Sequence, residues 1–143
     1  MLGLAISVQP GFDDAWGHPG AMYERRLGEE RAAPMNPIQD LLMRGLAVGA
    51  GSDSPVTELD PMLGLWALEA HHDPIQRLSR AQAIRLYTVG SAALAHLEEK
   101  KGALEPGMQA DFAAYDENPF TVDDPRGIRP VMTVSRGREV FVR

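Results

Sequence analysis

Residues 46–55 read Leu46-Ala47-Val48-Gly49-Ala50-Gly51-Ser52-Asp53-Ser54-Pro55, and this stretch decides the fold. Its first six residues are apolar or glycine, which predicts a short buried strand over 46–51. Glycine inside a strand indicates that another part of the backbone approaches closely. The Ser-Asp-Ser-Pro sequence that follows predicts a loop. We therefore expect Asp53 on a loop at the carboxyl end of a buried strand.

The segments before this strand predict one more strand and one helix. Residues 4–8 predict a buried strand closed by a turn. Residues 11–34 are rich in glycine, proline and charge and predict a long loop, with room for a short helix over 23–31. Residues 36–44 predict a helix that Asn36 caps and the following glycine ends.

The residues after Asp53 predict two amphipathic helices. Asp60 and Pro61 have the residue types of a cap and a first helical position, so a helix is expected over 61–71. Ser79 begins a capping-box sequence, which predicts a helix over 80–88.

The last part of the chain changes character. Gly90 is expected to break the helix before it, with Ser91 capping a further helix that Gly102 ends. Residues 111–115 predict a strand, and two strand-like runs within 131–142 predict a β-hairpin. The first hundred residues thus alternate strand and helix and the last forty are mostly β, so the expected class is α/β.

Composition excludes several kinds of protein. The chain has 14 basic and 20 acidic residues, a net charge of −6, and no basic run, so no nucleic-acid partner is expected. It has no cysteine, which excludes disulfides, cysteine-based zinc sites and thiol nucleophiles. No apolar run is long enough to cross a membrane, and the apolar N-terminus lacks the basic start of a signal peptide. We expect a cytoplasmic protein without membrane contact.

Asp53 is the first candidate for chemistry. A carboxylate just past a buried strand can bind a metal or act as a general base. The residue pattern alone fits a turn or capping aspartate as well, and that use is the commoner one. Spacing by itself therefore leaves both roles open.

The four histidines give no metal motif by spacing. They contain neither H-x-H nor H-E-x-x-H. His71 and His72 end the predicted helix over 61–71, so we expect a solvated helix terminus there rather than a metal site. His18 lies in the long loop and is a weak candidate for a pocket, together with Trp16 and Tyr23.

Several segments, in order and over nearly the whole chain, resemble the C-terminal third of the amidohydrolase superfamily. The resemblance is to its amidohydrolase-3 group and to enzymes like N-substituted formamide deformylase. The matching pieces are Ile6-Ser7-Val8-Gln9-Pro10, Gly49-Ala50-Gly51-Ser52-Asp53-Ser54-Pro55-Val56, Asp60-Pro61-Met62, Ala83-Ile84-Arg85-Leu86-Tyr87-Thr88, Gly102 to Phe112, and Val134 to Val140. The second piece, together with Leu-Glu-Pro-Gly-x-x-Ala-Asp over 104–111, is the most specific.

The resemblance implies a partial fold. Residues 1–101 would be the last two strand–helix units of a TIM barrel, with strands seven and eight. Residues 102–143 would be the C-terminal strands of a small β-sandwich. Family members often have lysine where Met108 stands, at a structural position.

The resemblance also implies a function, the hydrolysis of non-peptide C–N bonds in a small amide-type substrate. Asp53 would be the catalytic aspartate, which ligates zinc or another divalent metal and takes a proton from the metal-bound water. Gln9, Ser54 and His18 are candidates for substrate binding. Because the first six barrel strands and their metal-binding histidines are absent, this chain is expected to be inactive alone, and whether any metal binds to it stays open.

Two other readings stay open at this stage. The chain could be a non-catalytic remnant of the fold that forms a homo-oligomer through its exposed strand edges. It could also be one half of a split enzyme, completed by an N-terminal polypeptide that carries the H-x-H pair. A chain that starts directly on a strand fits a truncated product in each case.

Overall fold

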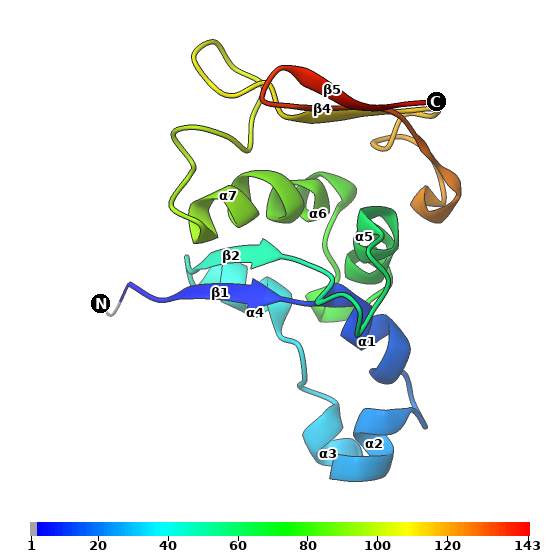
Figure 1. The fold of residues 1–143 in the computed structure, drawn as a ribbon. Helices are drawn as coiled ribbons and strands as arrows, with labels where there is room; N and C mark the ends of the chain where they lie inside the picture. The colour runs from blue at the N-terminus through cyan, green and yellow to red at the C-terminus, as the bar shows by residue number, and fades with distance from the viewer. Residues whose placement is uncertain (1–2) are drawn as a thin grey trace.

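The structure is a computed structural model that describes residues 3–143, so the predicted features of Met1 and Leu2 lie outside the described residues. Two small β-sheets lie at different levels with helices between them (Figure 1). The strands are β1 Ala5–Val8, β2 Ala47–Ala50, β3 Phe112–Tyr115, β4 Pro130–Ser135 and β5 Arg138–Val142. The α-helices are α1 Pro10–Trp16, α2 Met22–Leu27, α3 Glu29–Ala32, α4 Ile38–Met43, α5 Pro61–Ala70, α6 Arg80–Arg85 and α7 Ser91–Leu94. This order confirms the mixed α/β class.

Strands β1 and β2 form a parallel pair in which Ala5 lies opposite Ala47 and Val8 opposite Ala50. The strand predicted over 4–8 is present, but its burial was wrong, because β1 alternates between exposed and half-buried residues. Only β2 pairs with it, so its other edge has no neighbouring strand within residues 3–143. The turn predicted after it was also wrong. Pro10 begins α1 instead, since the fixed φ of proline suits the first turn of a helix.

The core lies between β2 and the helices α4, α5 and α6. Leu68 and Ala83 are fully buried there, and Ile38 and Leu65 are 2% exposed. The predicted close approach at the strand glycines is confirmed at Gly49 but not at Gly51, where a Cβ would meet nothing within 4 Å. A Cβ on Gly49 would lie 2.7 Å from Cδ1 of Leu94, and one on Gly90 would overlap the carbonyl oxygen of Val48. These two glycines therefore let a helix sit directly on β2.

The segment predicted as a long loop over 11–34 is instead mostly helical. It contains most of α1 together with α2 and α3, and Gly28, with φ of 79°, separates the last two. The expected cap at Asn36 was wrong as well. Asn36 has φ of 56°, α4 begins at Ile38, and the Asn36 side chain donates to Asp13 rather than to the helix. The side chain of Asn36, which the local sequence pattern predicted as a helix cap, thus bonds to a residue far away in the sequence.

The helix after Ser79 begins as predicted, because Ser79 and Gln82 form the reciprocal hydrogen bonds of a capping box. Its expected break at Gly90 was wrong. The helix continues through one π-helical turn over Leu86–Gly90 into α7, and Ser91 is a helical residue rather than a cap. The hydroxyl of Ser91 lies 2.9 Å from the carbonyl oxygen of Ala50 in β2.

This helix also ends earlier than the sequence predicts, at Leu94 rather than near Gly102. His96 has φ of 55°, the amide of His96 donates to Ala93, and the amide of Leu97 donates to Ala92. This is the pattern of a Schellman C-cap, in which a left-handed residue closes the last turn. The cap at Asp60, by contrast, is confirmed, since its carboxylate accepts from the amides of Met62 and Leu63.

The C-terminal sheet has the order β3–β4–β5 and is antiparallel throughout. The predicted hairpin is confirmed, with Arg136 and Gly137 at φ of 52° and 73° in its turn. All residues of β5 are exposed. None of the helices within residues 3–143 has the length and apolar character that crossing a membrane requires.

Candidate functional site

Because β1 and β2 are parallel, their carboxyl ends lie at the same end of the sheet. The amide of Gly51 donates to the carbonyl of Val8 over 3.0 Å, which extends the pairing past the last residue of β2. Gln9 and the loop over 52–57 therefore leave the sheet at the same edge. In proteins built from alternating strands and helices, this edge is where binding and catalytic groups gather.

The loop that carries Asp53 is shaped by its own hydrogen bonds. Asp53 has φ of 55°, and its carbonyl accepts from the amide of Val56 over 2.8 Å. The hydroxyl of Ser52 accepts from the amide of Ser54, and the hydroxyl of Thr57 donates to the carbonyl of Ser52. The side chain of Asp53 takes no part in these bonds and is exposed. The loop thus presents a free carboxylate beyond the end of β2.

The other predicted site residues are not gathered around Asp53. Gln9 lines a hollow of about 200 Å³ between the end of β1 and the start of α4. Ser54 lines a different hollow of about 410 Å³ between α1 and its own loop. The side chain of His18 is 52% exposed, with Nε2 3.9 Å from Oδ1 of Asp14. Their roles in substrate binding stay predictions.

Sequence reasoning missed a buried polar cluster formed by Asp13, His71 and His72. Asp13 and His71 are each 1% exposed, so the prediction of a solvated terminus at the end of α5 was wrong. Oδ1 of Asp13 lies 2.6 Å from Nδ1 of His72 and accepts from the Asn36 amide group, while Oδ2 accepts from the backbone amide of His72. The two histidine rings stack with centroids 4.6 Å apart.

The protonation of the two histidines follows from their partners. Nδ1 of His71 accepts from the amide of Asp73, so Nε2 carries the proton and donates to the carbonyl of Asn36. Burial lowers the pKa of His71, which agrees with a neutral ring. His72 differs, because its Nδ1 faces the Asp13 carboxylate and its Nε2 lies 3.1 Å from the carbonyl of Ala33. Both of its nitrogens therefore face oxygen acceptors.

These three residues have ligand atoms within 4.8 Å of one another, and they are the one such group found within residues 3–143. A metal would need a free lone pair on each histidine. The one nitrogen lone pair of the neutral His71 ring already accepts a hydrogen bond, and both nitrogens of His72 are turned to oxygen acceptors. The cluster is therefore a hydrogen-bond network that joins α1, α5 and the chain before α4, and its donor set does not fit a metal.

Asp53 does not complete a metal site within this chain either. A catalytic zinc typically takes three protein ligands, and Asp53 offers one exposed carboxylate outside the only ligand-type cluster found within residues 3–143. The described residues supply one ligand of such a site and not the set, so we derive no metal-dependent step from them.

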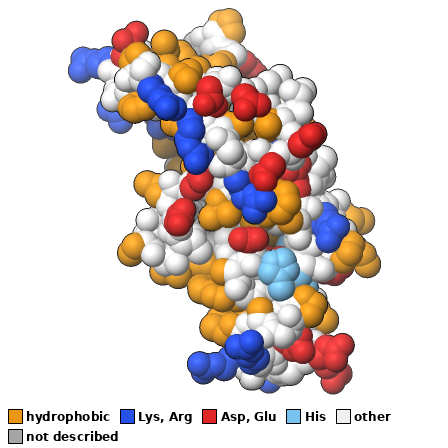
Figure 2. Space-filling view, turned by 90° about the vertical axis from the view of Figure 1, so that its right-hand side faces the viewer, with side chains coloured by type: hydrophobic (Ala, Val, Ile, Leu, Met, Phe, Trp, Pro, Cys, Tyr) orange, Lys and Arg blue, Asp and Glu red, His pale blue; other side chains and the backbone are white. Residues whose placement is uncertain are grey.

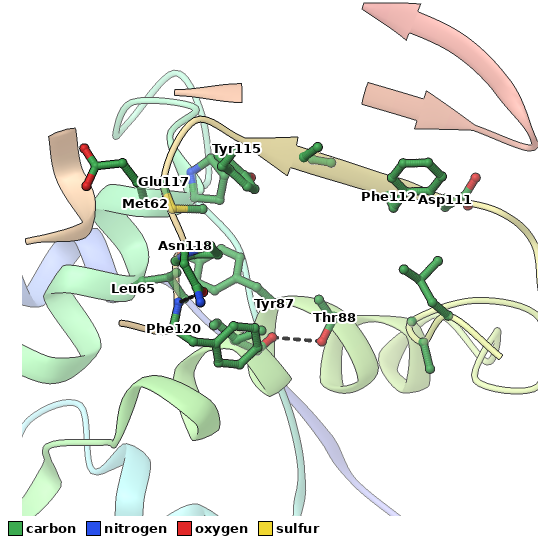
Figure 3. A pocket seen from close by; sticks show the side chains of 18 of the residues that line it. Met62, Leu65, Tyr87, Thr88, Asp111, Phe112, Tyr115, Glu117, Asn118 and Phe120 are labelled. Atoms are coloured by element: carbon green, nitrogen blue, oxygen red, sulfur yellow. Dashed lines mark hydrogen bonds between the residues drawn. The ribbon is translucent and has the colours of Figure 1, made fainter. Parts of the chain in front are cut away.

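A cavity of about 790 Å³ lies elsewhere, between β3 and the helices α5 and α6 (Figure 3). Phe112 and Tyr115 project from β3 on one side, and Tyr87 and Thr88 lie on the helix opposite. None of its lining residues belongs to the loop over 52–57. Burial and, to a smaller extent, the charge of Asp60 raise the pKa of Tyr87 to about 12. The cavity is thus separate from the Asp53 loop and mostly apolar.

Comparison with known proteins gives the same family from sequence and from structure. The sequence model of the amidohydrolase family matches residues 1–141. YtcJ of Bacillus subtilis strain 168, named as an amidohydrolase, is 29% identical over 133 residues, which are 84% of this chain and 24% of YtcJ. N-substituted formamide deformylase of Arthrobacter pascens is 24% identical over 125 residues, 82% of this chain and 23% of that enzyme.

A solved structure extends this similarity to the fold. An uncharacterized metal-dependent hydrolase from Pyrococcus furiosus superposes with a TM-score of 0.73 at 33% identity, covering 84% of this chain and 25% of that one. The chain thus spans about a quarter of the length of the curated relatives and of the solved structure it matches. With a family match over nearly every residue, the chain belongs to the amidohydrolase family.

Proposed function

We propose that this chain supplies the Asp53-bearing part of a metal-dependent amidohydrolase that acts on non-peptide C–N bonds of a small amide-type substrate. The observation that carries the proposal is the place of Asp53. It follows the carboxyl end of β2, at the edge where β1 also ends, and its carboxylate is exposed. That edge is where barrels of alternating strands and helices hold their catalytic groups.

In this proposal β1 and β2 are the last two strands of a barrel, within residues 1–101, and β3 to β5 within 102–143 are part of a β-sandwich. Two strands cannot close a barrel, because closure needs a full ring of tilted strands. The remaining strands and metal ligands would come from polypeptide other than these 143 residues. That polypeptide is either the rest of a longer protein or a separate subunit, as in a split enzyme.

The proposed cofactor is zinc or another divalent metal, which when bound would supply a hydroxide near neutral pH and polarise the scissile carbonyl. Asp53 would contribute one ligand. Gln9, at the same sheet edge, and Ser54, in the Asp53 loop, would face the substrate, with His18 at the end of α1 further out.

A second candidate role is assembly, favoured by the C-terminal sheet. Val140, Phe141 and Val142 in β5 are 63%, 44% and 58% exposed, and β5 has a free edge within the described residues. A free strand edge with apolar side chains is a site of strand pairing. We propose that the isolated chain associates with itself through this sheet. A size-exclusion mass equal to one chain at all concentrations would contradict it.

The purified 143-residue chain tests whether the site is incomplete. We expect less than one equivalent of zinc after dialysis and no hydrolysis of N-formyl or N-acyl amines, because one carboxylate does not hold a catalytic metal. Metal content is measured by plasma mass spectrometry and hydrolysis by amine release. One bound zinc per chain with turnover, both lost in Asp53→Asn and kept in Glu58→Gln, would show that the site is complete in this chain.

A further inference from the structure

The segment over 17–35, here called the arm, leaves the body of the molecule after α1 and returns before α4. It contains α2 and α3, which lie beyond the carboxyl ends of β1 and β2 and away from the two sheets (Figure 1). In α2 no residue is buried, and in α3 only Ala32 is. Figure 2 shows acidic and basic side chains side by side on this lower end of the molecule. The arm therefore gains little from core packing.

The contacts that hold the arm to the body are concentrated at its two stems. On the outgoing stem, Trp16 stacks on Phe12 and meets Tyr23 edge-on. On the return stem, the carbonyls of Ala33 and Asn36 face His72 and His71, and the Asn36 amide group donates to Asp13. Asp13 in α1 and the two histidines at the end of α5 thus clamp the return stem from both sides.

Asp13 is the centre of this clamp. Its buried carboxylate accepts three hydrogen bonds from two partners, His72 and Asn36. The bond to Nδ1 of His72 is short, at 2.6 Å, as is typical of bonds in which one partner is ionised. Removing one partner of a buried charged pair leaves the other uncompensated, which makes such a clamp sensitive to a single proton.

We propose that Asp13 and His72 form a proton-dependent latch that holds the arm closed. In this latch the protonated ring of His72 has two N–H groups and donates one to Asp13 and the other to Ala33. After loss of one proton it keeps a single N–H. That proton stays on Nδ1, because the partner of Nδ1 is a buried carboxylate. Nε2 then becomes an acceptor that faces the carbonyl of Ala33, so the hydrogen bond to Ala33 is lost. The Ala33 contact is also the solvent-exposed one, so water replaces it readily.

The charged and titratable groups around His72 support loss of the proton on Nε2 before the proton on Nδ1. Asp13 faces it from α1, and the neutral ring of His71 stacks on it from α5. Asp73 turns its carboxylate to the amide of Ile75. From the arm, Tyr23 has a pKa raised through burial and, to a smaller extent, the charge of Asp13. Asp13 is thus the one anion in contact with the His72 ring among the described residues.

The latch lies at the carboxyl-end face of the parallel strands, so the arm borders the entrance to the catalytic site if Asp53 acts as proposed. Opening would then change access to that face. This consequence rests on the proposed function, while the latch itself does not, since it needs neither metal nor substrate.

Amide hydrogen exchange of the whole chain, followed by mass spectrometry on peptides from the arm and from β2, tests the latch. In Asp13→Asn we expect the arm to exchange about tenfold faster or more, with β2 unchanged, because the opening is local. Asp123→Asn removes a charge from an exposed aspartate outside the arm and is expected to change neither peptide. Equal acceleration of arm and β2, or no acceleration of the arm, would overturn the proposal.

The unmodified protein gives a second test that does not depend on how the variant folds. As pH is raised, arm exchange corrected for the intrinsic rate is expected to rise several-fold over the range in which ¹⁵N spectra show His72 losing a proton. ¹⁵N spectra are expected to show two protonated nitrogens on His72 at the low end and Nδ1–H alone at the high end. An arm whose corrected exchange is independent of pH, or a neutral His72 at the low end, would overturn the latch. Neither result would bear on Asp53.

Discussion

Single residues in this chain are held by partners that are either adjacent or very distant in sequence. Asp60 and Ser79 cap their helices as the sequence predicts, because a cap depends on residues within one turn. The bond between Asp13 and His72 joins residues 59 positions apart. No spacing rule links an aspartate in one helix to a histidine at the end of another, so only the fold reveals their pairing.

The three tyrosines predict how folding stability depends on alkaline pH. The chain has three, Tyr23, Tyr87 and Tyr115, and burial raises the pKa of each, that of Tyr87 to about 12. A tyrosine in an unfolded chain ionises near pH 10. The unfolded state therefore loses these protons first, and folding stability is expected to fall as pH rises above about 10.

An absorbance titration at alkaline pH measures this. We expect little tyrosinate at about pH 10 in the folded chain, and Tyr87→Phe should remove the transition of highest pH, whereas Tyr23→Phe should leave it in place. Three tyrosines that titrate together near pH 10 while the chain stays folded would contradict the burial described above.

At the scale of elements, the contact between β2 and the helix over 80–94 explains where local prediction failed. Glycine inside a helix costs about 1 kcal/mol relative to alanine, so the sequence alone favours a break at Gly90. The structure keeps the helix intact because Gly90 lies against the backbone of Val48 and Gly49. The strand glycines did predict a close approach, but not which element approaches.

The substitution Gly90→Ala tests this contact. Alanine favours the helix, yet its Cβ would overlap the carbonyl oxygen of Val48, so we expect a net loss of about 1–3 kcal/mol in the free energy of unfolding. Gly127→Ala is the matched control, because a Cβ there meets nothing within 4 Å, and it should change stability by less than about 0.5 kcal/mol. Urea unfolding measures both. A stabilised Gly90→Ala protein would show that the helix does not sit on the strand as described.

At the scale of the whole molecule, sequence reasoning predicted the class, the two strands of the parallel pair and the C-terminal hairpin, because each leaves a local pattern of apolar residues and turns. It placed Asp53 beyond a strand for the same reason. That the two strands are neighbours was implied only by the family resemblance. Sequence reasoning allowed a short helix over 23–31, where α2 and α3 lie, but it did not predict the clamp, because a bond between residues far apart in sequence leaves no local pattern.

The central claim is that Asp53 belongs to the catalytic site of a larger amidohydrolase. It is tested most directly by joining this chain to the N-substituted formamide deformylase of Arthrobacter pascens in place of the matching quarter of that enzyme. The measurement is kcat/KM for hydrolysis of an N-substituted formamide. Glu58→Gln, an exposed carboxylate in the loop after Asp53, is the control of equal charge change. The account predicts that Asp53→Asn lowers kcat/KM at least about a hundredfold and that Glu58→Gln leaves it within about twofold. Equal activity of the two variants would contradict it.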